Sequence, residues 1–249
     1  MRNILVLGAT SSIAQACIRQ WINQDQMIQL HLVARNQEKI ARVCDDLKVR
    51  YPSLSIAYYL VDLSDNDQIF DQMQQILNHY TIDLCLIAQG IMYLDEGSLS
   101  AEEIQRLIQT NSVSIATSTD LVYQRMHQQG HGQIGVIGSV AGDRGRRTNY
   151  LYGASKAFVD TYIQGLQHRA ALENSGVRLS LIKPGPTQSE MTAHLISQGK
   201  KLPHADEVAS IIVRGLAQNK RIIYAPKIWR IIMLVICHIP FFIFKKLDI

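Results

Sequence analysis

The stretch NILVLGATSSIA, residues 3–14, decides the fold. Its apolar run ends at Gly8, and small polar residues then lead into an amphipathic helical pattern over 14–22. A turn of this kind points backbone N–H groups and the positive end of a helix dipole at one place, which suits a pyrophosphate. Only one glycine is present, so the motif is weak by itself, because any turn between a strand and a helix can look similar.

The same alternation of strand and helix continues along the chain. Short apolar strands are predicted at 28–33, 56–61, 84–88, 133–138, 177–182 and 221–224, with helical patterns between them. This order predicts an α/β fold with a doubly wound parallel sheet, a Rossmann fold, in which ligands bind at the carboxyl ends of the strands. No linker divides residues 1–226, so we expect a single domain there, followed by an apolar segment at 227–249.

Composition excludes several classes of function. The 249 residues are 47% hydrophobic and 18% charged, with a formal net charge of +4 and no long basic tract, so a nucleic-acid partner is not expected. The four cysteines are scattered and form no C-x-x-C pair, which favours a reduced compartment. His127 and His131 straddle Gly130 and indicate a solvated turn, so we expect no metal. The first apolar run is too short for a secretory signal, which predicts a cytoplasmic protein.

Candidate catalytic residues lie in the stretch SVAGDRGRRTNYLYGASK, residues 139–156. Tyr152 and Lys156 are four residues apart, so on a helix they share one face and the ammonium can depress the pKa of the phenol. Ser139 follows a predicted strand end. Asn111 interrupts the helical pattern of 101–128, where a polar side chain either belongs to the same site or only satisfies a neighbouring backbone group.

In this combination the chain resembles the short-chain dehydrogenase/reductase family over roughly residues 3–224. Tyr152 to Lys156 match the family's Y-x-x-x-K, and Ser139 and Asn111 stand at its other catalytic positions. The resemblance implies that Tyr152 is the general acid or base and that Ser139 binds the carbonyl oxygen. It also implies that Lys156 stabilises the tyrosinate and holds the nicotinamide ribose, and that Asn111 anchors a water.

The resemblance further implies a nicotinamide cofactor. Arg35 follows the second predicted strand, where an arginine accommodates the 2′-phosphate of NADP and an acid favours NAD, so NADP(H) is expected over NAD(H); a solvated arginine is the alternative. Two glycines of the family's motif are replaced by Ser12 and Ala14, and the family's N-N-A-G appears as Ile87-Ala88-Gln89-Gly90, which loses both asparagines. The expected cofactor-binding residues are Gly8, Thr10, Ser11, Ser12, Ile13, Arg35, Asp62, Leu63, Gly90, Tyr152, Lys156, Pro184, Gly185, Thr187 and Ser189.

The loop of residues 141–149 carries three arginines between two catalytic positions. Arg144 and Arg147 could clamp a phosphate or carboxylate of the substrate, and a solvated basic loop is the alternative.

The apolar run 231–244 has aromatic and basic flanks and is short for a membrane span. It is expected to contact a membrane surface through 228–246 or a second subunit, rather than to form a simple core helix. These alternatives predict a peripheral protein at the inner membrane face or a homodimer or homotetramer.

The tail and the opening from Gly8 to Ser11 are also similar to lipid-linked sugar keto-reductases of the family, which act on a decaprenylphosphoryl 2-keto-pentose. The expected function is therefore NADP(H)-dependent hydride transfer to or from a carbonyl or alcohol, with a lipid-linked keto-sugar phosphate as one substrate. A cytosolic reductase of a small ketone or acyl substrate is the alternative. A non-catalytic NADP-binding protein agrees less well with an intact catalytic set.

Overall fold

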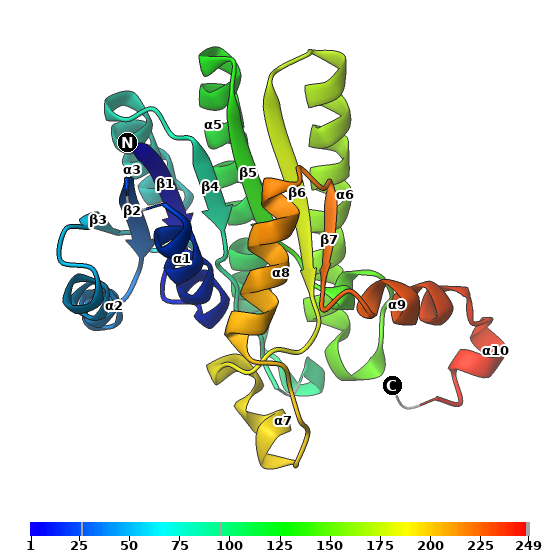
Figure 1. Ribbon diagram of the computed structural model, residues 1–249. Helices are drawn as coiled ribbons and strands as arrows, with labels where there is room; N and C mark the ends of the chain where they lie inside the picture. The colour runs from blue at the N-terminus through cyan, green and yellow to red at the C-terminus, as the bar shows by residue number, and fades with distance from the viewer. Residues whose placement is uncertain (26, 95, 248–249) are drawn as a thin grey trace.

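A seven-stranded sheet forms the centre of the computed structural model, which describes residues 1–25, 27–94 and 96–247 (Figure 1). All strand pairs are parallel, and the order is β3-β2-β1-β4-β5-β6-β7. The strands are β1 Arg2–Leu7, β2 Ile28–Ala34, β3 Ser55–Leu60, β4 Leu84–Ile87, β5 Gly132–Ile137, β6 Val177–Pro184 and β7 Ile222–Ala225. The order reverses between β1 and β4, which makes the carboxyl ends of these two strands the place for a ligand.

Helices cover both faces of the sheet. Buried side chains of α1, α2 and α8 form one apolar cluster with the sheet, and those of α3, α5 and α6 form the other. The predicted doubly wound fold is confirmed. The helices are α1 Ser12–Gln24, α2 Gln37–Arg50, α3 Asn66–His79, α4 Ala101–Ile108, α5 Ser114–Gln129, α6 Tyr150–Leu172, α7 Ala193–Ser197, α8 Ala205–Ala217, α9 Trp229–His238 and α10 Phe241–Phe244.

The predicted strands and long helices lie within a few residues of those observed. The interruption predicted in 101–128 is a π-helical turn, Gln109–Val113, between α4 and α5.

The apolar run 231–244 forms two helices, α9 and α10. They are separated at Pro240, because proline cannot donate a backbone hydrogen bond. Residues 248 and 249 of the predicted C-terminal segment lie outside the described residues. Among the helices described, none has the length and apolar character needed to cross a bilayer.

Gly8 holds the turn between β1 and α1. Its φ of +73° is a conformation that side chains with a Cβ rarely adopt. A Cβ at this position would also lie 2.6 Å from the backbone nitrogen of Gln89 and 2.8 Å from the carbonyl carbon of Ala88. The first βα turn can therefore approach the end of β4 only because residue 8 is glycine.

Replacing Gly8 by alanine should lower the free energy of unfolding by at least about 2 kcal/mol, because strain and a backbone clash add to each other. Gly165→Ala is the matched control: Gly165 lies on the exposed side of α6 and a Cβ there meets nothing within 4 Å. That change should stabilise the protein by up to about 1 kcal/mol. Urea unfolding measures the stability of both variants. Equal stability of the Gly8→Ala variant and the wild type would contradict the requirement for glycine at this turn.

Candidate active site

Asn111 lies in the π-helical turn between α4 and α5, a type of helix distortion that is frequent at functional sites. Its side chain is completely buried. The carboxamide accepts a hydrogen bond from the backbone nitrogen of Ile91 and donates one to the oxygen of Ile91, both at 2.8 Å. It also donates to Ser155 Oγ at 3.2 Å. Asn111 thus connects the segment that follows β4 to the helix that carries Tyr152 and Lys156.

Lys156 is buried on α6. It lies four residues after Tyr152, so the two side chains share one face of the helix. Its ammonium donates to the backbone oxygen of Ile137, at the end of β5, at 3.2 Å, and lies 5.8 Å from the centre of the Tyr152 ring. Burial lowers the pKa of Lys156 to about 8, and the negative charge of Asp160 opposes this effect. The amine is therefore largely protonated at neutral pH and presents a positive charge beside the phenol.

Ser139 and Tyr152 place two hydroxyl groups side by side. Ser139 lies two residues after the end of β5, and its Oγ accepts a hydrogen bond from the nitrogen of Ala141 at 3.1 Å. Burial raises the pKa of Tyr152, while a hydrogen bond with Ser139 lowers it. Tyr152 therefore keeps its proton at neutral pH, as a group that donates a proton to a carbonyl oxygen must.

Gly90 brings the remaining groups together. A Cβ at this position would lie 3.5 Å from both Asn111 Oδ1 and Lys156 Nζ, so the backbone after β4 passes directly over these two polar groups. The four residues predicted to be catalytic thus meet at the carboxyl ends of β4 and β5.

The first turn of α1 has the features of an anion-binding site. Ser11 precedes the helix, and among the described residues no side chain caps this helix N-terminus. Its backbone N–H groups therefore remain available to a phosphate, beside the close approach at Gly8. Thr10 lies in the same turn, where its backbone oxygen accepts from Gln15 Nε2 at 2.9 Å. Ser12 and Ile13 begin the helix. These residues fit the pyrophosphate of a dinucleotide.

The carboxyl ends of β2 and β3 contribute charged groups to the same edge of the sheet. Arg35 follows β2 and is exposed. Asp62 follows β3, and its Oδ1 accepts from the nitrogen and the hydroxyl of Ser64 at 2.9 and 2.8 Å. These hydrogen bonds, together with the charge of Arg35, hold the pKa of Asp62 below its ordinary value. Leu63 is buried beside it. Arg35 and Asp62 are therefore near one another, as a site for an adenosine moiety requires.

The segment after β6 closes the site on the other side. Pro184 and Gly185 are buried, and the Thr187 hydroxyl donates to the oxygen of Gly185 at 2.9 Å. Ser189 Oγ lies 3.1 Å from Thr192 Oγ1 in a capping arrangement. A Cβ at Gly185 would overlap the indole nitrogen of Trp229, so α9 packs directly against this segment. The sequence carried no signal for this contact.

Comparison with known proteins identifies the family. The family profile described as short chain dehydrogenase matches residues 2–200. The chain belongs to the short-chain dehydrogenase family. An uncharacterized oxidoreductase of Streptomyces coelicolor is 28% identical over 251 residues, which cover 99% of this chain and 96% of that protein. A very-long-chain 3-oxoacyl-CoA reductase of Anas platyrhynchos is 26% identical over 194 residues, 76% of this chain and 60% of that protein.

Solved structures show the same fold. A short-chain dehydrogenase from Sphingobium yanoikuyae in complex with NADPH superposes with a TM-score of 0.82 at 22% identity, over 96% of both chains. The bulky-bulky ketone specific alcohol dehydrogenase from Comamonas testosteroni has a TM-score of 0.80 at 20% identity, over 96% of this chain and 95% of that one. The predicted family and the oxidoreductase class are thus confirmed, and a nicotinamide cofactor is the family's hydride carrier.

Arg144 of this short-chain dehydrogenase has different partners from those predicted. Its guanidinium donates to the backbone oxygens of Ile236 and Ile239, the latter at 2.7 Å, and lies 3.8 Å from the centre of the Phe244 ring. Arg144 connects the loop of residues 141–149 to α9 and α10, because carbonyls at a helix end attract a cation, and the predicted pair of anion-binding arginines stays a prediction. Arg147 is exposed on the same loop.

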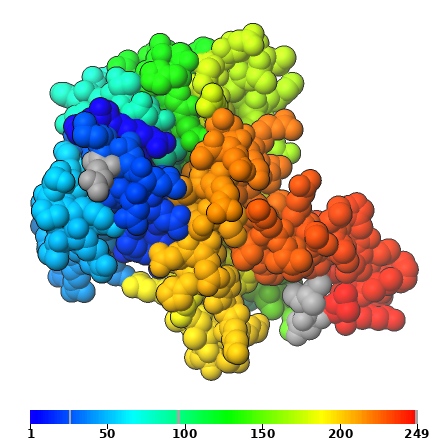
Figure 2. Space-filling model, viewed as in Figure 1, coloured from blue at the N-terminus to red at the C-terminus, as the bar shows by residue number. Residues whose placement is uncertain are grey.

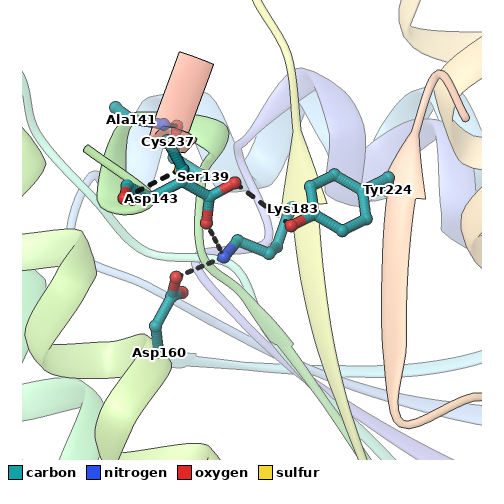
Figure 3. Close-up of polar contacts among 7 residues, drawn as sticks. All are labelled: Ser139, Ala141, Asp143, Asp160, Lys183, Tyr224 and Cys237. Atoms are coloured by element: carbon teal, nitrogen blue, oxygen red, sulfur yellow. Dashed lines mark hydrogen bonds and ion pairs between the residues drawn. The ribbon is translucent and has the colours of Figure 1, made fainter. Parts of the chain in front are cut away.

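Sequence reasoning missed a buried ionic network around Lys183, which Figure 3 shows. Lys183 on β6 forms ion pairs with Asp160 on α6 and with Asp143 on the catalytic loop. The hydroxyl of Tyr224 on β7 donates to Asp143 Oδ2 at 3.1 Å, and Cys237 Sγ on α9 donates to the backbone oxygen of Asp143 at 3.3 Å. A usable signal existed, because Asp160 follows Lys156 by four residues and Tyr152 by eight, on one face of α6.

Positive and negative charges alternate in this network, which has Lys156 at one end. Burial would lower the pKa of Lys183, but Asp160 and Asp143 outweigh it, and the pKa is raised. Burial raises the pKa of Asp160 to about 6 against the opposing charge of Lys183, so the carboxyl is still ionised at neutral pH. Its Oδ1 is buried without a hydrogen-bond partner among the described residues. That oxygen would lie 3.1 Å from a Cβ at Gly138, next to Ser139, so a negative charge is held at the rear of the catalytic site.

Asp160→Asn should shift the alkaline limb of the pH–activity profile to lower pH by about one unit. Asp160 favours the protonated form of Lys156, so its removal lowers the pH at which the tyrosine–lysine pair loses a proton. The shift is measured from initial rates of carbonyl reduction between about pH 6 and pH 10. Asp46→Asn, on exposed α2, is the control and should leave the profile unchanged. An unshifted profile in an Asp160→Asn variant that folds would contradict the role of Asp160.

Proposed function

We propose that the protein is an NADP(H)-dependent oxidoreductase that transfers hydride between the nicotinamide and a carbonyl or alcohol substrate. The observation that carries the proposal is the meeting of Asn111, Ser139, Tyr152 and Lys156 at the carboxyl ends of β4 and β5, with the Tyr152 hydroxyl bonded to Ser139. The cofactor, when bound, supplies or accepts the hydride.

The side chains of the protein handle the proton. Tyr152 donates it to the carbonyl oxygen in reduction or removes it from the alcohol in oxidation, and Ser139 hydrogen-bonds the same oxygen. The ammonium of Lys156 stabilises the tyrosinate that forms, because it lies buried on the same helix face. Asn111 holds the segment after β4 against α6, so the distance between the two parts of the site stays constant.

A preference for NADP(H) is supported by Arg35, because a guanidinium at the end of β2 can bind a 2′-phosphate bidentately. The structural neighbour from Sphingobium yanoikuyae is described as a complex with NADPH, and another, ElxO, as bound to NADP. The cradle at Gly8, Thr10, Ser11, Ser12 and Ile13 would hold the pyrophosphate. Asp62 and Leu63 would border the adenine, and Gly90 and the segment from Pro184 to Ser189 the nicotinamide.

A lipid-linked keto-sugar phosphate is the proposed substrate. Arg147 offers a cation for its phosphate, and the apolar α9 and α10 lie beside the catalytic loop, where a hydrocarbon chain could lie. A second candidate is an acyl or other ketone substrate without a sugar phosphate. The similarity to a very-long-chain 3-oxoacyl-CoA reductase favours that candidate.

Contact with a membrane surface belongs to the same proposal. Residues 228–246 expose apolar side chains between Lys227 and Arg230 on one side and Lys245 and Lys246 on the other. A segment with this pattern lies in the interface of a bilayer. We therefore propose a peripheral protein at the inner membrane face, active as a homodimer or homotetramer.

The central test is a carbonyl panel in which NADPH oxidation is followed for lipid-linked keto-sugar phosphates, acyl ketones and small neutral ketones. Tyr152→Phe removes the proton donor and should lower the rate on the preferred substrate by at least about 100-fold, with little change in thermal stability. Equal rates for wild type and variant would exclude the mechanism. The substrate class that shows the highest kcat/KM decides between the two candidate substrates.

Arg35→Ser should raise the KM for NADPH by about 10- to 100-fold and leave the KM for NADH nearly unchanged, because only the contact to the 2′-phosphate is lost. Arg178→Ser is the control. Arg178 is also exposed, but it lies near the amino end of β6 and therefore far from the carboxyl ends of the strands, where the cofactor is proposed to bind. A parallel change in both KM values in the Arg35 variant would argue against NADP selectivity through this residue.

A further inference from the structure

A groove opens at the β7 edge of the sheet, outside the site described above. It has a volume of about 230 Å³ and lies between α8, β7 and the start of α9. Apolar side chains form part of its lining, namely Ile211, Ile222 and Ile223. Four cations complete it: Arg214 from α8, Lys220 before β7, and Lys227 and Arg230 at the start of α9.

The four cations have no acidic partner in the part of the chain that the structure describes. None of them forms an ion pair within the described ranges, although other surface cations do, such as Arg19 with Asp206 at 2.8 Å and Lys39 with Glu190 at 2.7 Å. All four are exposed. Like charges around one hollow repel each other, and an anion bound between them would remove that repulsion. The groove is therefore complementary to an anionic group.

The groove continues directly into an exposed apolar surface. Trp229 and Met233 of α9 face the protein body, and Met233 is 1% exposed. The outward face of the same helix exposes Leu234 to 61%, and α10 exposes Phe241 to 73%. Figure 1 shows α9 and α10 extending sideways from the β7 end of the sheet, and Figure 2 shows this segment projecting from the body. A charged hollow and an apolar projection thus adjoin on one side of the molecule.

We propose that this groove binds the phosphate of an anionic membrane lipid while α9 and α10 rest in the same bilayer surface. The inference rests on the membrane contact proposed above and adds to it a headgroup site built from residues outside the tail, Arg214 and Lys220. Guanidinium groups bind phosphate oxygens bidentately, and lysines near a membrane are attracted to anionic lipid. The apolar lining at Ile211 and Ile222 accommodates the glycerol end of the lipid, so the ligand is an amphiphile with a phosphate.

The test is co-flotation of the full chain with vesicles of phosphatidylcholine alone and with about one third phosphatidylglycerol. The wild type should bind the anionic vesicles more tightly. Arg214→Gln/Lys220→Gln should lower that binding by about 10- to 30-fold, since each cation near the surface contributes to partition. The matched control is Arg42→Gln/Lys48→Gln, which removes the same two residue types from exposed α2 at the other end of the sheet. It should bind nearly as the wild type does.

The possible failures are distinguishable. Leu234→Ser/Phe241→Ser changes only the tail and should weaken binding to both kinds of vesicle. If the wild type binds neither vesicle, the membrane contact itself is wrong. If the tail variant loses binding and the groove variant equals the control, the groove assignment alone is overturned.

Two further measurements address other occupants of the groove. Calorimetric titration with inorganic phosphate would overturn the proposal if it showed binding that the groove variant loses while vesicle binding is kept. Light scattering would overturn it if the groove variant changed the oligomeric mass and not the vesicle binding. NADPH-dependent activity in the absence of vesicles should equal that of the wild type in the groove variant and in its α2 control, because none of these four residues belongs to the proposed catalytic, cofactor or substrate site.

Discussion

Parallel pairing of β1 with neighbours on both sides is the constraint on which the rest of the structure depends. Leu7 pairs with Val33 on β2 and with Ile87 on β4, so three strand ends lie at one edge of the sheet. Parallel strands need crossovers, and the crossover from β1 leads to β2 while the crossover from β4 leads to β5 in the opposite direction. The resulting opening receives the turn at Gly8, the segment at Gly90 and, one strand further, Ser139. Chemistry can occur there because these backbone segments end at the same place.

Alternating charge is the second organising feature of the site. An ammonium as deeply buried as that of Lys156 is costly unless negative charge is near it. Asp160 supplies that charge and is in turn balanced by Lys183, which also pairs with Asp143 of the catalytic loop (Figure 3). The ion pair between Lys183 and Asp143 therefore anchors the loop between Ser139 and Tyr152 to β6. The same interactions that stabilise the loop also set the electrostatic environment of Tyr152, the proposed proton donor.

The C-terminal segment is part of the same arrangement. Arg144 reaches from the catalytic loop to the carbonyls that end α9, and Trp229 packs on Gly185. One face of α9 thus contacts the loop and the segment after β6, while the other face is apolar and exposed. A ligand or membrane that moved α9 would therefore act on residues adjoining the site. The contacts of α9 with Arg144 and Gly185 thus couple the apolar C-terminal segment to the polar loop beside the site.

The sequence by itself determined the order of strands and helices, the family and the group of Asn111, Ser139, Tyr152 and Lys156. Such features depend on local periodicity and on spacing within single elements, as in the four residues between Tyr152 and Lys156. Only the tertiary structure decided the partners of Arg144, the network of Asp143, Asp160 and Lys183, and the contact of Trp229 with Gly185. These contacts join residues from 23 to 100 positions apart in the chain, as the pairs Asp160–Lys183 and Arg144–Phe244 illustrate. The spacing along α6 places Asp160 on the same face as Lys156 and Tyr152, but no local pattern encodes the partners, because the contacts arise where separate elements pack against each other.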